Sequence, residues 1–173
     1  PNNPADFITI VPRDAADADS DKYSYTTAGS PLKVTAPIAA GTAQIRYISG
    51  QGRAVLARRD LELVASEVTL DAEPEIGAGG NLEVTWTGPN NDGDYITIVM
   101  KIARDAHFEG YAYTRGGSPL KVRTPITPGA AEIRYVSGQG RQVLARRDLT
   151  LKVTEVTLSA ADWWNAYCDN MRD

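Results

Sequence analysis

The chain of 173 residues contains two copies of one sequence, offset by 88 positions. Residues 1–72 align with 89–160 without a gap, and about 45 of these positions are identical, which indicates duplication. The repeat is out of phase with the chain ends, because residues 67–88 precede the second copy and nothing comparable precedes the first. We therefore expect a piece of a longer tandem array.

The repeat predicts three parts. Unit one (1–65) is expected to be a β-sandwich that lacks its opening strands, and unit two (66–158) a complete one. A short helical tail (159–173) is expected to follow. The run from Arg59 to Leu70 joins the two units without a Gly/Ser/Pro linker, which predicts a fairly fixed relation between them.

Hydrophobic periodicity within a unit is two, which is typical of β-strands. Apolar residues alternate with polar ones in 82–86, whereas 95–99 is apolar on both faces and is expected to be a central strand. Turn-forming Gly, Pro, Asn and Asp separate the segments. The strands expected in unit two are 67–70, 82–86, 95–99, 111–114, 120–122, 132–136 and 143–153.

Seven short strands in about 90 residues predict an all-β fold, with two antiparallel sheets packed as a sandwich. A bulge is expected in the last strand near Arg146 and Arg147, where strict alternation breaks. We expect Trp86 to lie in the core of unit two, in contact with Ile98 and Tyr135. If residues 67–88 instead served unit one, Trp86 would contact residues of that unit.

Segments 84–89 and 94–99 resemble the second and third strands of immunoglobulin-like or fibronectin-III-like modules, and segment 128–135 resembles their penultimate strand. The whole unit is also similar to tandem repeats of bacterial envelope proteins that carry von Willebrand factor A-type domains. The resemblance covers nearly the whole chain except the tail. It implies a spacer, display or adhesion role outside the cytoplasm, either extracellular or in the periplasm and cell envelope. It implies no activity at a named residue.

Composition excludes several other classes. The net charge of -4 and a pI near 5.1 argue against a nucleic-acid binder, which needs a basic face. No apolar run approaches the roughly 20 residues of a membrane-spanning helix, so no membrane insertion is expected. With one cysteine and one histidine, the chain has neither an intrachain disulfide nor a cluster of Cys or His metal ligands. Recognisable acid–base and nucleophilic sets are also missing, which predicts a non-enzymatic protein without a required cofactor.

The acidic stretch 14–21 is the candidate metal site. Asp17, Asp19 and Asp21 have the alternate spacing with which a tight loop presents several carboxylates to one Ca²⁺ ion. The alternative is a solvated surface loop, since the equivalent stretch 102–110 lacks the pattern. The Asn- and Asp-containing segment 2–6 and its mate 90–94 are interpreted as turns rather than as a second oxygen-rich site.

Each unit contains the tract Ser-Gly-Gln-Gly-Arg between two expected strands. Arg53 and Arg141 could bind a carboxylate or a sulfated glycan through bidentate contacts. The arginine–aspartate runs 58–60 and 146–148 are expected to pair with neighbouring strands or with the junction between units.

In the tail, a Ser cap precedes an apolar face formed by Trp163, Tyr167 and Met171, with Trp164 beside it. This face is expected to dock on unit two or, alternatively, to bind a partner. Trp163, Trp164 and Tyr167 are therefore candidate interaction residues.

Three functions follow from these observations. The first is a spacer or interaction module whose partner is another protein or other copies of this chain. The second is an adhesin module that binds calcium or a glycan. The third is an accessory module of an enzyme, or an enzyme with an unusual site. Because unit one lacks opening strands, we also expect a strand from outside it, from a longer chain or another copy, to complete it.

Overall fold

The computed structural model describes residues 2–155, which form an all-β structure with three sheets and two single-turn 3₁₀ segments, Thr26–Ala28 and Thr114–Gly116. The strands, in chain order, are β1 (Phe7–Pro12), β2 (Tyr23–Tyr25), β3 (Gly41–Ile48), β4 (Val55–Leu63), β5 (Thr69–Asp71), β6 (Glu75–Gly77), β7 (Asn81–Thr87), β8 (Tyr95–Met100), β9 (Gly110–Tyr113), β10 (Leu120–Arg123), β11 (Gly129–Val136) and β12 (Val143–Lys152). None of the described helices could span a membrane. The predicted tail helix, with Trp163, Trp164 and Tyr167, lies outside the described residues.

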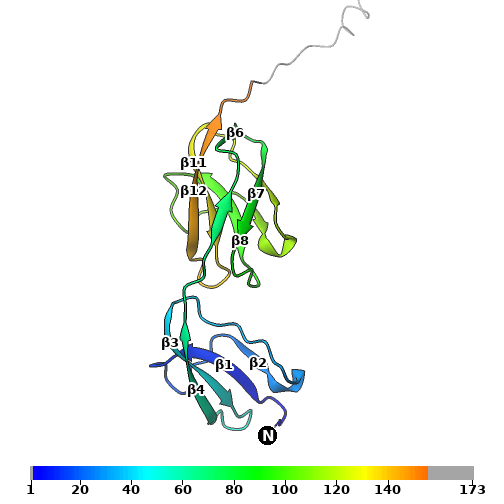
Figure 1. Cartoon of the computed structure of the whole chain (residues 1–173), viewed down its shortest axis with the longest axis vertical. Coiled ribbons are helices and arrows are strands. Elements are labelled where there is room, and N and C mark those ends of the chain that lie inside the picture. The colour runs from blue at the N-terminus through cyan, green and yellow to red at the C-terminus, as the bar shows by residue number, and fades with distance from the viewer. Residues whose placement is uncertain (1, 156–173) are drawn as a thin grey trace, which may run out of the picture.

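Unit one contains a single four-stranded antiparallel sheet, in the order β2-β1-β3-β4 (Figure 1). Its two central strands are six and eight residues long, and they pair from Phe7 with Ile48 to Pro12 with Ala43. The segment 32–35, which matches β10 of unit two, is not a strand here. Within the described part of unit one, one face of the sheet therefore has no second sheet opposite it.

Unit two has a three-stranded sheet, β10-β7-β5, and a strongly curled five-stranded sheet, β6-β12-β11-β8-β9. The expectation of purely antiparallel sheets was wrong at one place, because β6 runs parallel to β12, with Glu75 opposite Thr150. The sequence analysis also missed β6 itself. This strand has only three residues and follows Pro74, so it is too short to display a period of two.

The hydrophobic core of unit two is made by both of its sheets. Strand β7 alternates exposed and buried residues along its length, as its sequence predicts. Trp86 lies in this core together with Ile98, and its ring centroid is 5.6 Å from that of Tyr135. The prediction that Trp86 belongs to unit two is therefore confirmed.

The irregularity in β12 lies closer to the start of the strand than predicted. Tyr135 pairs with Ala145 and Val136 with Val143, so Leu144 is the extra residue. Arg146 and Arg147, where the bulge was expected, are in register with β11 and have polar partners elsewhere. Alternation fails there because successive residues both find polar partners, not because the backbone bulges.

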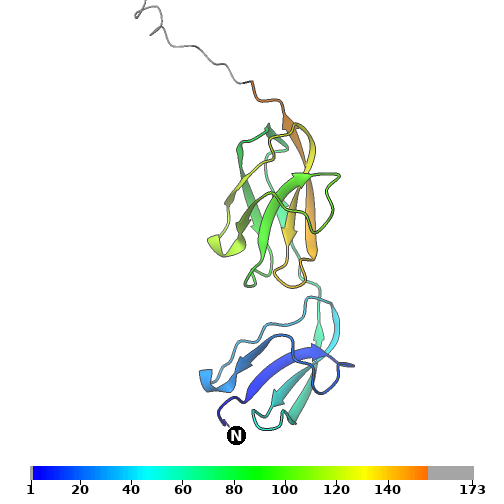
Figure 2. The ribbon, with the colours of Figure 1, turned by 180° about the vertical axis from the view of Figure 1, so that it is seen from behind.

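Residues 64–68 connect β4 of unit one directly to β5 of unit two, and Figure 2 shows this connection from behind. At the same junction, the side-chain amide of Gln139 donates a hydrogen bond to the carbonyl oxygen of Ala36, over 3.1 Å. The two units therefore meet through a short strand-to-strand connection and a direct polar contact.

Candidate functional site

An aromatic pocket of about 310 Å³ lies on unit two where β8, β9 and the turn after β11 come together. Its walls carry Tyr95 from β8, Tyr111 and Tyr113 from β9, and Phe108 from the preceding loop. The rings contact one another edge to face, with centroid separations between 5.4 and 6.5 Å. Since Tyr111 is 46% exposed, this aromatic cluster is a surface and not a core.

Arg141 supplies the cation of this pocket. It occupies the tight turn between β11 and β12 with a φ of 55°, in the left-handed region, and its guanidinium lies 5.9 Å from the centroid of the Phe108 ring. The lining residues include this arginine and no carboxylate. Burial raises the pKa of Tyr95, and the hydrogen bond with Tyr113 raises the pKa of Tyr111, so these phenols stay neutral donors at neutral pH.

Unit one repeats the arrangement in a pocket of about 220 Å³. Phe7, Tyr23 and Tyr25 take the places of the three tyrosines, and neighbouring ring centroids are 4.9 and 5.3 Å apart. Arg53, with a φ of 54°, places its guanidinium 5.5 Å from the Phe7 ring and donates to the Ser20 hydroxyl over 2.9 Å. We call these two sites the aromatic–arginine pockets. The two arginines selected from the sequence are thus at equivalent sites.

A buried aspartate holds the arginine-bearing turn in each unit. In unit two, the carboxylate of Asp94 accepts hydrogen bonds from the Tyr135 hydroxyl and from the backbone N–H groups of Asn91 and Gly138. In unit one, Asp6 accepts the same set, including the N–H of Gly50 over 2.8 Å. The Gly50 hydrogen bond is the main cause that lowers the pKa of Asp6. Each aspartate therefore fixes both the turn that it ends and the one that carries the arginine.

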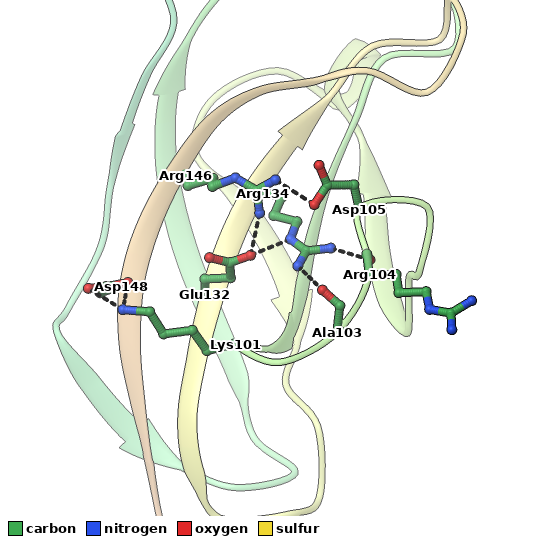
Figure 3. Close-up of polar contacts among 8 residues, drawn as sticks. All are labelled: Lys101, Ala103, Arg104, Asp105, Glu132, Arg134, Arg146 and Asp148. Carbon is green, nitrogen blue, oxygen red and sulfur yellow. Dashed lines mark hydrogen bonds and ion pairs between the residues drawn. The ribbon is translucent and has the colours of Figure 1, made fainter.

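A buried arginine fixes the loop that contributes Phe108. Arg134 on β11 is 1% exposed, and its guanidinium donates to the carbonyl oxygens of Ala103 and Arg104, each over 2.7 Å (Figure 3). The same guanidinium pairs with Glu132 over 2.5 Å, and Arg146 bridges Glu132 to Asp105. The hydrogen bond that Arg146 donates to Asp105 lowers the pKa of Asp105 and raises that of Arg146.

Unit one anchors its acidic loop in the same way. Arg46 donates to the carbonyl oxygens of Ala15 and Ala16, and Gln44 stands where unit two has Glu132. The arginine–aspartate runs also pair with neighbouring strands and loops, as expected. These contacts join Arg58 to Asp17, Arg13 to Asp60, Lys101 to Asp148 and Arg147 to Asp71.

The three aspartates predicted to hold calcium have different surroundings. Asp17 forms an ion pair with Arg58 over 2.7 Å, which lowers its pKa, and Asp19 accepts a hydrogen bond from the N–H of Ala16. Among the described residues, no group of three or more His, Cys, Asp or Glu side chains is arranged to hold a metal ion. Calcium binding at Asp17, Asp19 and Asp21 stays a prediction.

Sequence reasoning missed the aromatic members of the pockets. Tyr111 and Tyr113 were assigned only to a strand, although two tyrosines separated by a single residue on a short strand must present both rings to the same face. That spacing, repeated at Tyr23 and Tyr25, was the available signal. No protein-family model, curated protein or solved structure matches the chain.

Proposed function

We propose that the chain is a segment of tandem Ig-like β-sandwich units that acts as a spacer and interaction module of a secreted or cell-envelope protein. The observation that supports this role is the repetition of one framework, with the same aromatic–arginine pocket, in two directly connected units. A spacer must hold its binding surfaces at a defined interval. The partner of such a module is a protein, a glycan or another copy of the chain.

The junction supports the spacer role. Only residues 64–68 separate β4 from β5, and they contain no glycine. The hydrogen bond from Gln139 to Ala36 adds a second connection that spans about 100 residues of sequence. A short connection without glycine restricts the range of interdomain angles.

Small-angle X-ray scattering tests the spacer role. A single orientation of the two units should fit the scattering curve, and insertion of a Gly-Gly-Ser segment after Ala65 should broaden the pair-distance distribution. A wild-type curve that needs a broad range of interdomain angles would contradict the proposal.

A second candidate function is glycan binding, which the pockets support. Exposed aromatic rings provide flat apolar surfaces for the ring faces of a ligand, and a guanidinium binds a carboxylate or sulfate through paired N–H groups. Each pocket combines both elements and is free of carboxylates among its lining residues. An acidic or sulfated saccharide therefore suits the pockets better than a neutral one.

Calorimetric titration with sulfated and uncharged oligosaccharides of equal length tests this candidate. Binding of the sulfated form should weaken at least tenfold in Arg141→Ala/Arg53→Ala, whereas Arg123→Ala, which removes an exposed arginine outside the pockets, should bind as wild type. Equal weakening in both variants would show only a general charge effect and would refute a specific site.

A further inference from the structure

Unit one has a second recess, on the open face of its sheet, with a volume of about 440 Å³. We call it the strand groove. It runs between β1 and β3 on one side and the segment 29–34 on the other. Its lining residues are Asn2, Ile8, Thr26, Gly29, Ser30, Leu32, Val34, Ile45 and Tyr47.

The equivalent surface of unit two is covered by β7. Strand β10 pairs with β7 in antiparallel register, from Leu120 opposite Val84 to Arg123 opposite Asn81. The core residues Ile96, Ile133 and Tyr135 beneath it are completely buried, whereas their mates in unit one are only half-buried. The strand groove is therefore the place that β7 fills in unit two.

All nine residues that line the strand groove are identical to their mates in unit two. Across the whole repeat, by contrast, more than a third of the positions differ. An apolar surface that stayed in water would favour polar replacements, because exposed apolar faces promote aggregation. Retention of the full set indicates that unit one needs the same occupant that unit two has.

The polar contacts that hold β7 also have their counterparts in the strand groove. In unit two, the backbone N–H of Trp86 donates to the Ser118 hydroxyl over 2.9 Å, and its indole N–H donates to the carbonyl oxygen of Gly117 over 3.0 Å. Gly29 and Ser30 occupy these positions in unit one and line the groove. The groove thus has both the apolar floor and the two acceptors that a tryptophan-bearing strand requires.

We propose that the strand groove of unit one binds an extended polypeptide segment with the alternation Leu-x-Val-x-Trp, supplied by a further unit of this repeat. The segment adds antiparallel to residues 32–35, as β7 does to β10, and places its tryptophan beside Gly29 and Ser30. The main-chain hydrogen bonds provide affinity, and the three alternate side chains provide specificity. This assignment goes beyond the proposed function, because neither the spacer role nor the aromatic–arginine pockets use this face.

The groove lining contains no charged side chain, which favours an apolar strand over a charged ligand. Within the described residues, the one segment with this alternation is β7, and it is already part of unit two. The occupant must therefore come from another unit. Gly110 packs against the backbone of Arg123, which pairs with Asn81 at the end of β7 far from the tryptophan, and Lys22 replaces this glycine in unit one. The match between the units is therefore closer where the tryptophan binds.

A synthetic peptide with the sequence of residues 67–88, which spans β5 to β7, serves as the probe. It is titrated into the isotopically labelled 173-residue chain and followed by calorimetry and by amide NMR shifts. The control peptide carries alanine in place of Trp86. Two chain variants complete the test: Val34→Asp puts a charge into the groove wall, and Lys33→Asp changes an exposed neighbour on the same non-strand segment.

We expect binding of one peptide per chain, with shifts concentrated at Ile8, Ile45 and Tyr47. The alanine peptide and Val34→Asp should each weaken binding at least tenfold, and Lys33→Asp should leave it unchanged. Absence of binding overturns the proposal, as does equal binding of the two peptides. NMR shifts confined to unit two also overturn the proposal, since the peptide would then have replaced β7. A dimer of the chain that the peptide does not dissociate overturns it as well, since a second copy would then cover the groove.

Discussion

Replacement of the buried Arg134 tests how the loops that carry the aromatic residues are held. In Arg134→Met, the loop 101–109 loses the two hydrogen bonds from the guanidinium to the carbonyl oxygens of Ala103 and Arg104. A hydrogen bond from a charged donor contributes about 1.5–3 kcal/mol to stability. The methionine side chain recovers part of the lost stability by packing in the space of the arginine. In addition, Glu132 stays buried without its main partner, although Arg146 still contacts it. We expect a loss of about 3 kcal/mol in the free energy of unfolding of unit two.

Unit one provides the matched control. Arg46→Met removes two equivalent hydrogen bonds to Ala15 and Ala16, but the neighbouring Gln44 is neutral and leaves no buried charge. We expect a loss of about 2 kcal/mol there. The double variant Glu132→Gln/Arg134→Met, which copies the neutral side chain of unit one, should recover about 1 kcal/mol relative to Arg134→Met.

Hydrogen exchange with mass spectrometry at increasing urea concentrations measures both units in one sample, because peptides from β3 and β11 report separately. The Arg134→Met variant should lower the protection of β11 and open the loop 101–109 even without urea. Equal losses in Arg134→Met and Arg46→Met, or no recovery in the double variant, would refute the role assigned to the buried carboxylate.

Three further predictions concern backbone fit and pH. Gly110→Ala should destabilise unit two by more than 2 kcal/mol in urea unfolding, because an added Cβ would lie 2.2 Å from the backbone oxygen of Arg123. Burial raises the pKa of Tyr135 to about 12, so the stability that the neutral phenol contributes is complete below pH 10 and is lost between about pH 10 and 12. A free energy of unfolding that does not change in this pH range would contradict the prediction. The hydrogen bond from the Gly50 N–H is the main cause of the lowered pKa of Asp6. The stability that the Asp6 carboxylate contributes is therefore present above the ordinary aspartate pKa and is lost as the pH falls below it. Asp6→Asn should make the stability of unit one less sensitive to acid in hydrogen-exchange measurements.

The sequence predicted the strands from apolar–polar alternation where it is present, and from apolar runs bounded by turn residues elsewhere. Strand β7 is the best example, since Leu82, Val84 and Trp86 all face the core. The position of the bulge was less predictable. Arg146 and Arg147 broke the polarity pattern, but the extra residue is Leu144, whose apolar side chain gave no signal.

The candidate site was predicted only in part, because its members come from three separate segments. Arg141 was found through the repeated turn, whereas Phe108 lies on a loop that differs between the units. Its contact with Tyr111, at 5.6 Å between ring centroids, depends on how Arg134 anchors that loop. Sequence spacing does not give such a distance, since the anchoring contacts are to backbone atoms.

This dependence on backbone contacts allows the two anchored loops to differ more than the strands that hold them. Arg46 and Arg134 bind main-chain carbonyl oxygens, which every residue provides, so the loop side chains are free to change without loss of the anchor. One such change places Phe108 in unit two where unit one has Ser20. The phenylalanine adds a ring to the larger pocket, and the serine instead accepts a hydrogen bond from Arg53 in the smaller one. The anchored loop is thus the element that changes the lining of the pocket between the two units while its anchor stays the same.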